Sequence, residues 1–177
     1  MTADIIFEKL RTVLCDMLIL NPSDVQLHSK LVDDLDADSI AFLELTFCLR
    51  QDFGLEIPQT KVDEEMLTLP LLDGLQRLRE AEGGVTLFEF MPLASGEALS
   101  PELQAAQQFS ALSDEQKLAQ AQRMTVGDLA AMMGTTPPAS FAAEQLMSEL
   151  RVRDLFRFIT VQSYVRYVQH LQQLQVC

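Results

Sequence analysis

A single serine, Ser39, stands between an acidic segment and an apolar one. Four aspartates come shortly before it: Asp33, Asp34, Asp36 and Asp38. A serine at this position could cap a helix, and acids near a helix start suit the helix dipole. A cap needs one short polar residue, however, and four neighbouring acids repel one another at neutral pH. We therefore expect the excess negative charge to serve a basic partner.

Catalysis at Ser39 would need a base within hydrogen-bond reach of the hydroxyl. The two histidines, His28 and His170, lie in no recognisable motif, and no G-x-S-x-G sequence is present. His28 lies in the segment before Ser39, so a dyad of these two residues stays an alternative. The acids could bind a metal ion, but the twelve-residue calcium-loop pattern is absent. The sequence predicts no catalytic residue and no metal site.

The composition predicts an all-α protein. The chain has 177 residues, of which 48% are hydrophobic, and helix-forming residues dominate while alternating β-branched residues are rare. This length suffices for one ordinary domain or a small domain with an appendage. No signal peptide and no run of about 20 apolar residues is present, so we expect a cytoplasmic protein without a membrane span.

The charge of the chain favours protein partners over nucleic acid. The formal net charge is −13, and 14 of the 26 acidic residues lie within the first 66 positions. Such a field repels nucleic acid and anionic membranes and attracts basic proteins. The three cysteines, Cys15, Cys48 and Cys177, have no metal-ligand spacing. We expect the first two to be reduced core residues.

Two amphipathic helices are predicted in the first third of the chain. Helical spacing of apolar residues predicts one helix over residues 3–20 and another from Ser39 to Phe53, with Gly54 as its C-terminal cap. Three leucines should hold the loop between them: Leu27, Leu31 and Leu35. Further helices are expected over residues 67–79, from residue 100, from a capping box at residues 113–116, over residues 125–133, and over residues 140–174 with Thr160 capping a new turn.

The segment DDLDADSIAFLELTFCLRQDFGLEIP, residues 33–58, resembles the prosthetic-group segment of acyl carrier proteins. The shared features are Asp38-Ser39-Ile40, then an amphipathic helix, then Asp52-Phe53-Gly54 and Glu56-Ile57-Pro58. The resemblance extends over residues 5–58. It implies a four-helix bundle in which Ser39 is esterified by 4′-phosphopantetheine from coenzyme A. A phosphopantetheinyl transferase would attach this arm, and acyl chains would ride on its thiol as thioesters.

The resemblance also assigns roles along the second helix. Family positions that contact partners fall on Asp36, Asp38, Ile40, Leu43, Glu44 and Phe47. Family positions that line the acyl pocket fall on Leu45, Leu49 and Ile57. Simple core packing is the alternative for Leu43 and Phe47. The implied partners are acyl-loading, condensing or acyl-transfer enzymes with basic docking patches.

The sequence departs from the family pattern at several positions. Arg50 and Gln51 replace two acids, Ala41 replaces another, and Asp36 stands where glycine is common. The negative charge expected at the docking surface therefore decreases along the helix. We expect a carrier dedicated to a specialised fatty-acid, polyketide or lipid pathway. An aminoacyl or aryl carrier of a peptide-synthetase-like pathway, or an unmodified helical interaction protein, would fit the same bundle, but the acidic loop and the stretch FGLEIP favour the acyl carrier.

The chain is long for this family, and three segments could form the closing helix of the bundle. They are residues 67–80, 124–133 and 158–177, and the last is favoured because such chains tend to end just after this helix. The expected organisation is a carrier core over residues 1–60, a largely helical insertion over residues 61–157 and a closing helix over residues 158–177. With the first segment as closing helix, the extra residues would be a C-terminal extension. The methionines and phenylalanines of the insertion could form an adaptable apolar surface or the insertion's own core.

Overall fold

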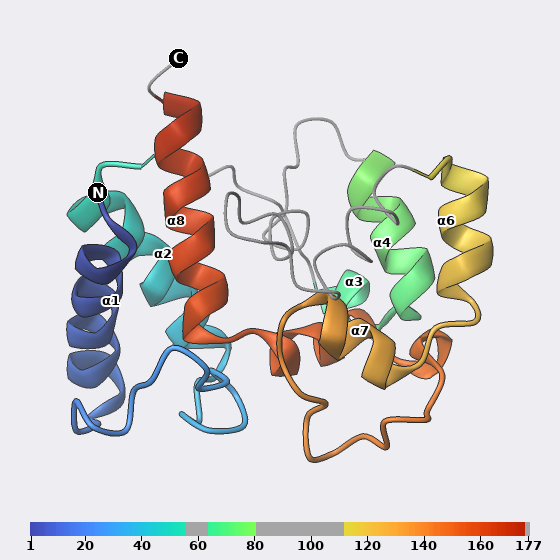
Figure 1. Cartoon of the computed structure of the whole chain (residues 1–177), viewed down its shortest axis with the longest axis horizontal. Coiled ribbons are helices and arrows are strands. Elements are labelled where there is room, and N and C mark those ends of the chain that lie inside the picture. Colours follow the sequence, from blue (N-terminus) through green and yellow to red (C-terminus); the bar gives the residue numbers. More distant parts are fainter. Residues whose placement is uncertain (56–63, 81–111, 176–177) are drawn as a thin grey trace. The chain divides into compact units, whose positions relative to one another are not determined.

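The computed structural model describes residues 1–55, 64–80 and 112–175 (Figure 1). Their elements are α1 (Ala3–Leu18), α2 (Ser39–Phe53), α3 (Glu64–Thr68), α4 (Leu71–Glu80), α6 (Asp114–Ala121), α7 (Val126–Met132), the 3-10 helices η2 (Met147–Glu149) and η3 (Val152–Phe158), and α8 (Val161–Gln175). Within these ranges the secondary structure is helical, with three isolated β-bridges and no strand. The predicted all-α class is confirmed.

The chain divides into two compact units. The first comprises Met1–Ile57 and Ile159–Cys177, and the second comprises Pro58–Phe158. Of the three segments that could close a carrier bundle, the one containing α8 belongs to the first unit. The other two contain α3, α4 and α7 and belong to the second unit.

None of the helices in the described ranges is long and apolar enough to cross a membrane.

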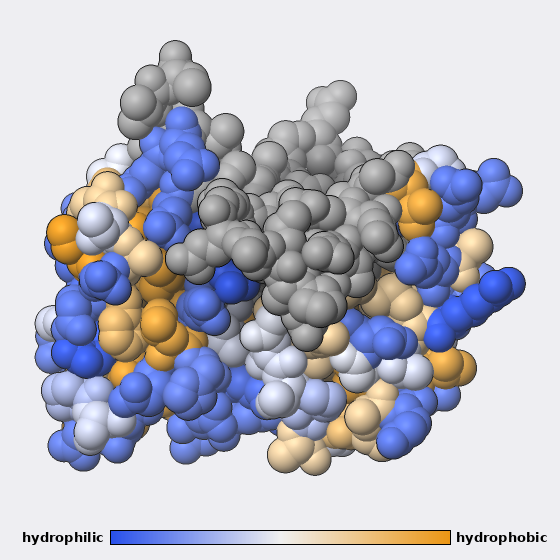
Figure 2. Space-filling view, in the orientation of Figure 1, coloured by the Kyte–Doolittle hydropathy of each residue, from blue (hydrophilic) through white to orange (hydrophobic). Residues whose placement is uncertain are grey.

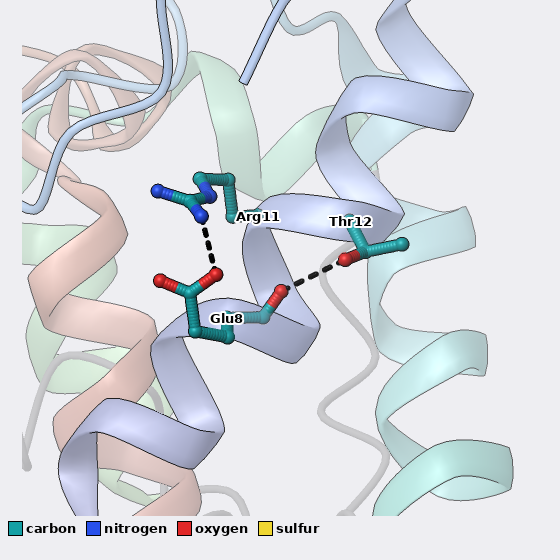
Figure 3. A network of polar contacts seen from close by, with 3 residues as sticks. All are labelled: Glu8, Arg11 and Thr12. Carbon is teal, nitrogen blue, oxygen red and sulfur yellow. Dashed lines mark hydrogen bonds and ion pairs between the residues drawn. The ribbon is translucent and has the colours of Figure 1, made fainter. Parts of the chain in front are cut away.

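Helix α1 packs against both α2 and α8 through one apolar face. Ile6, Leu10 and Leu14 are fully buried on that face, at the spacing that the sequence predicted. On another face the Arg11 guanidinium pairs with the Glu8 carboxylate, and the Thr12 hydroxyl donates to the Glu8 carbonyl at 2.9 Å (Figure 3). Such exposed pairs add little stability, so burial of the apolar face holds this helix in place.

The end of α2 is tied to α1 by one lysine. The Lys9 ammonium lies 5.2 Å from the centre of the Phe53 ring and donates to the Asp52 carbonyl at 3.3 Å. A cation at this end of a helix also complements its dipole. Gly54 follows with φ of 64°, which confirms it as the C-terminal cap.

The start of α8 is held by backbone hydrogen bonds to the loop between α1 and α2. Leu31 donates to the Ile159 carbonyl at 2.9 Å, and Val161 and Gln162 donate to the Ser29 and Leu27 carbonyls at 3.0 and 2.8 Å. The side chains of Leu31 and Leu35 are buried as predicted. The prediction for Leu27 is wrong: its side chain is 41% exposed, and only its carbonyl holds the loop.

Thr160 caps α8, as predicted. Its hydroxyl accepts a hydrogen bond from the Ser163 amide, and the Ser163 hydroxyl accepts one from the Thr160 amide, both at 3.2 Å. For the part of the predicted 140–174 segment that precedes Thr160, the prediction of α-helix is wrong, however. Residues 140–158 form turns and the two 3-10 helices, because Leu150 and Val152 use their backbone groups to bond Leu71 and Leu69.

The pattern of backbone hydrogen bonds that holds the start of α8 occurs again in the second unit. Met147 donates to the Met124 carbonyl, while Val126 and Gly127 donate to the Gln145 and Ala143 carbonyls, so the bridge before α7 has the register of the bridge before α8. A third bridge, between Pro70 and Arg151, precedes α4. The three helices α4, α7 and α8 therefore each begin directly after an antiparallel bridge.

Methionines and phenylalanines form the interior of the second unit. Met124, Met133, Met147 and Phe158 are buried, and the Phe141 ring stacks on Phe158 with centroids 6.3 Å apart. Of the two interpretations of these side chains, the structure therefore favours the insertion's own core. The capping box predicted at residues 113–116 is confirmed, since Ser113 and Gln116 bond reciprocally.

Candidate functional site

Ser39 is the first residue of α2, and its side chain is exposed. The residue that caps the helix is Asp38, whose Oδ1 accepts a hydrogen bond from the Ala41 amide at 2.9 Å. The view of Ser39 as the cap is therefore wrong. Within the part of the chain that is described, the Ser39 hydroxyl makes no hydrogen bond. The helix backbone therefore fixes the position of the residue, while its hydroxyl is not engaged in a hydrogen bond.

The loop before Ser39 is shaped by its own backbone. Ala37 donates to the Leu31 carbonyl at 2.8 Å, and Leu35 donates to the Lys30 carbonyl at 3.2 Å. The side chains of Leu35 and Ala37 are buried beneath the loop. This arrangement delivers Ser39 to the surface at the N-terminal end of α2, where free amides and the helix dipole favour a negatively charged group such as a phosphate.

The four aspartates of this loop are not equivalent. Asp34 accepts a hydrogen bond from the Lys30 amide at 2.7 Å, and Asp38 caps α2. Asp33 is half-buried. Asp36 is exposed and has φ of 54°, so it occupies a left-handed conformation at the position where the family commonly has glycine. Two of the acids thus have local structural roles as well as contributing to the field around Ser39.

One face of α2 presents apolar side chains to solvent. Ile40, Leu43 and Phe47 are 62%, 71% and 59% exposed, and Glu44 is exposed beside them. We call Ile40, Leu43 and Phe47 the exposed stripe. Figure 2 shows that apolar side chains also reach the surface among hydrophilic ones on the visible face of the first unit. Because Leu43 and Phe47 are exposed, core packing does not explain them.

The opposite face of α2 belongs to the core. Leu45 and Leu49 are almost completely buried, and so is Leu55 just beyond the helix. Ile57, the third residue expected at an acyl pocket, lies outside the described residues. Phe42 contacts Tyr164 of α8, with ring centroids 6.5 Å apart. This ring contact joins α2 to α8 within the first unit.

Two of the residues that replace family acids, Arg50 and Gln51, lie in different surroundings. Gln51 is exposed, whereas Arg50 is half-buried. Burial raises the pKa of Tyr167 on α8, and the positive charge of Arg50 opposes this rise. Arg50 thus lies close to α8. The sequence analysis treated both replacements as changes to the docking face and did not predict that Arg50 lies near α8.

Raising the pH above about 10 is expected to destabilise the first unit through Tyr164. Burial, and to a lesser extent Tyr167, raises the pKa of Tyr164 above its ordinary value of 10.0. The unfolded chain then loses the proton before the folded chain does, so stability that is present below pH 10 is lost as the pH rises. The slope should approach about 1.4 kcal/mol per pH unit for this one group. Urea unfolding between about pH 9 and 11 should show a shallower dependence in Tyr164→Phe, and equal slopes would contradict the assignment.

Of the other groups considered from the sequence, those that the structure describes make no hydrogen bond with Ser39. His28 is exposed and makes no hydrogen bond with Ser39. Among residues 1–55, 64–80 and 112–175, no group of three or more His, Cys, Asp or Glu side chains is placed to hold a metal ion. Cys15 and Cys48 are free and half-buried, and burial raises the pKa of both thiols. Cys177 lies outside the described residues.

Comparison with known proteins gives a consistent result. A family model described as "Phosphopantetheine attachment site" matches residues 8–69. The acyl carrier protein of Campylobacter hominis is 37% identical over 59 residues, which are 33% of this chain and 75% of that protein. That of Petrotoga mobilis is 33% identical over 87 residues, or 49% and 87%, and that of Campylobacter concisus is 32% identical over 73 residues, or 41% and 95%. No solved structure matches the chain significantly.

Between 75% and 95% of the length of these acyl carrier proteins aligns with less than half of this chain. The matched region contains α1 from Glu8 onward, the acidic loop and α2, with the exposed serine at its centre. Covalently bound 4′-phosphopantetheine is the cofactor that this region indicates. The chain belongs to the acyl carrier protein family.

Proposed function

We propose that Ser39 is the attachment point of the 4′-phosphopantetheine arm and that a phosphopantetheinyl transferase attaches it from coenzyme A. The observation that carries this proposal is the exposed Ser39 hydroxyl at the first position of α2, where Asp38 has taken over the capping role. When bound, the arm supplies a terminal thiol that holds acyl groups as thioesters. Helix α2 keeps the attachment point rigid, and its N-terminal amides favour the phosphate.

Partner enzymes would dock on the exposed stripe and on the acids beside it. Asp36, Asp38 and Glu44 are exposed around Ile40, Leu43 and Phe47, so the surface combines apolar anchors with a negative rim. Such a surface suits acyl-loading, condensing or acyl-transfer enzymes with basic patches, because apolar anchors supply affinity and complementary charge speeds the encounter.

The carrier bundle would be closed by α8. Its start is hydrogen-bonded to the loop that precedes Ser39, and it packs against α1. In this proposal, residues 61–157 are an insertion, and Leu45, Leu49 and Ile57 shelter the acyl chain. The exposed Gln51 in place of an acid supports dedication to a specialised fatty-acid, polyketide or lipid pathway. In this proposal the protein acts in the cytoplasm.

Peptide mapping tests the attachment point directly. The purified chain is treated with coenzyme A and a broad-specificity phosphopantetheinyl transferase, digested, and analysed by fragmentation mass spectrometry. The arm should appear on the peptide that contains Ser39 and on no other. An arm on another serine would refute the assignment, and an unmodified chain would favour a helical interaction protein that keeps the carrier fold.

A further inference from the structure

Ile19, directly after α1, has a backbone conformation that isoleucine rarely adopts. Its φ is 56°, in the left-handed region, and among the described residues other than glycine only Asp36 shares this region. A branched Cβ makes this conformation costly, and the position after a helix usually holds glycine or asparagine for that reason. The side chain is 93% exposed, so burial does not offset the cost. Ile19 therefore does not stabilise the fold, and a strained residue of this kind indicates a functional role.

The conformation of Ile19 is fixed on both sides by hydrogen bonds. The Ile19 and Leu20 amides both donate to the Cys15 carbonyl, the latter at 3.1 Å, and these bonds close the last turn of α1. Just beyond, the Asn21 amide donates to the Asp24 carboxylate at 3.0 Å. An apolar residue whose backbone is held in one place loses little conformational freedom when a partner covers it, so Ile19 is preorganised for binding.

The end of α1 lies beside the first half of α2. The two helices run in opposite directions (Figure 1), and the Lys9 ammonium of α1 lies over the ring of Phe53, the last residue of α2. Ile19 follows Lys9 by ten residues, a rise of about 15 Å along α1. The same rise back along α2 from Phe53 ends at Leu43, in the centre of the exposed stripe. Ile19 is therefore close to the level of Leu43 and at the same end of the first unit as Ser39.

Acidic side chains accompany this apolar residue. Asp16 and Asp24 are exposed on either side of Ile19 in the sequence. Residues 16–38 include six aspartates and a single lysine. The negative field of this segment favours an enzyme with basic side chains, as it does around the exposed stripe. Ile19 thus combines an exposed apolar side chain with acidic surroundings, the same chemistry that the exposed stripe offers.

We propose that Ile19 is a second apolar anchor for the phosphopantetheinyl transferase, which contacts the end of α1 together with the exposed stripe. The inference rests on the proposed function. The transferase is the committed partner because it acts on the Ser39 hydroxyl itself and must approach this end of the unit, whereas later enzymes reach the thiol at the far end of a flexible arm. Its surface offers Ile19 an apolar pocket bordered by basic side chains. Ile19 serves docking and not the chemical step, so it lowers the KM for the carrier and leaves kcat unchanged.

Ile19→Asn separates docking from stability, because it removes the apolar side chain and also relieves the strain. Asparagine tolerates the left-handed conformation better than isoleucine does. With a broad-specificity phosphopantetheinyl transferase and coenzyme A, the variant should raise the KM for the carrier about five- to tenfold at unchanged kcat. It should also unfold at a higher urea concentration than wild type. A residue that only completed the fold would show the opposite change in stability.

Two control variants make the comparison specific. Ile19→Leu keeps an apolar side chain at the same place and should keep a KM close to that of wild type. Ile5→Asn removes an equal side chain near the opposite end of α1, where Ile5 is 49% exposed. This variant should also leave the KM unchanged, because Ile5 lies away from the end of the unit that carries Ser39.

Intact mass first shows whether wild type gains the arm. A wild type that gains none overturns the proposed function and this inference together. An unchanged KM in Ile19→Asn, or an equal rise in Ile5→Asn, would overturn the inference alone and leave the attachment at Ser39 intact. A raised KM together with a lower unfolding midpoint in Ile19→Asn would also overturn it, since the loss would then come from damage to the fold.

Discussion

Leu43→Arg is expected to reduce the kcat/KM for arm attachment by a phosphopantetheinyl transferase about thirtyfold or more. Leu43 is the most exposed member of the exposed stripe and lies between Ile40 and Phe47 on the same helix face. An apolar anchor at the centre of an interface typically accounts for about 2 kcal/mol or more. The added positive charge would also repel a partner with a basic patch.

A matched control separates this effect from a change of net charge. Ile5 on α1 is also an exposed apolar residue, so Ile5→Arg changes the charge equally without touching α2. Ile5→Arg should retain a kcat/KM close to that of wild type, and both variants should unfold at the wild-type midpoint because both positions are exposed. Equal losses in the two variants would show that the exposed stripe is not the docking surface.

Gly74→Ala is expected to destabilise the second unit by about 2–3 kcal/mol. Alanine in a helix is ordinarily more stable than glycine, so the sign depends on packing. A Cβ built on Gly74 overlaps the Cγ2 methyl of Val152, whose side chain is fully buried. Either α4 must move away from η3 or Val152 must leave its place, and both disturb the unit's core.

The cause can be isolated with a double-mutant cycle. Val152→Ala removes the overlapping methyl, so Gly74→Ala should cost much less stability when introduced into Val152→Ala than into wild type. Urea unfolding of the four proteins gives the coupling energy, and a cost that is the same in both backgrounds would contradict the packing. Ser39 belongs to the other unit, so arm attachment should continue in Gly74→Ala below its unfolding transition.

Local sequence signals were sufficient to predict the bounds of α2 but not to predict which residue caps its start. The apolar spacing and Gly54 fix both ends of the helix, and the structure has the same bounds. Asp38 and Ser39 are adjacent and both are good N-caps, so propensity does not separate them. The fold of the loop determines which of the two residues caps the helix, because the hydrogen bond from the Ala37 amide to the Leu31 carbonyl positions Asp38 as the last residue before the helical turn.

The closing helix illustrates a second limit of sequence reasoning. Helices α4, α7 and α8 each begin after an antiparallel bridge, and α7 and α8 also share a Thr-Val start. The similar starts reflect the same local requirement, namely an extended residue followed by a capped helix. The three helices differ in the segment that pairs across the bridge. This segment is distant in the sequence, so the residues around each helix start do not indicate which segment it is. The same non-local bonds explain why residues 140–158 are not an α-helix.

Intact mass after treatment with coenzyme A and a phosphopantetheinyl transferase tests the central claim most directly. Wild type and Ser23→Ala, which alters another exposed serine before α2, should each gain the mass of one phosphopantetheine arm. Ser39→Ala should gain nothing, although it should fold normally because Asp38 supplies the cap. A full gain of mass in Ser39→Ala, or none in wild type, would contradict the assignment of Ser39 as the attachment point.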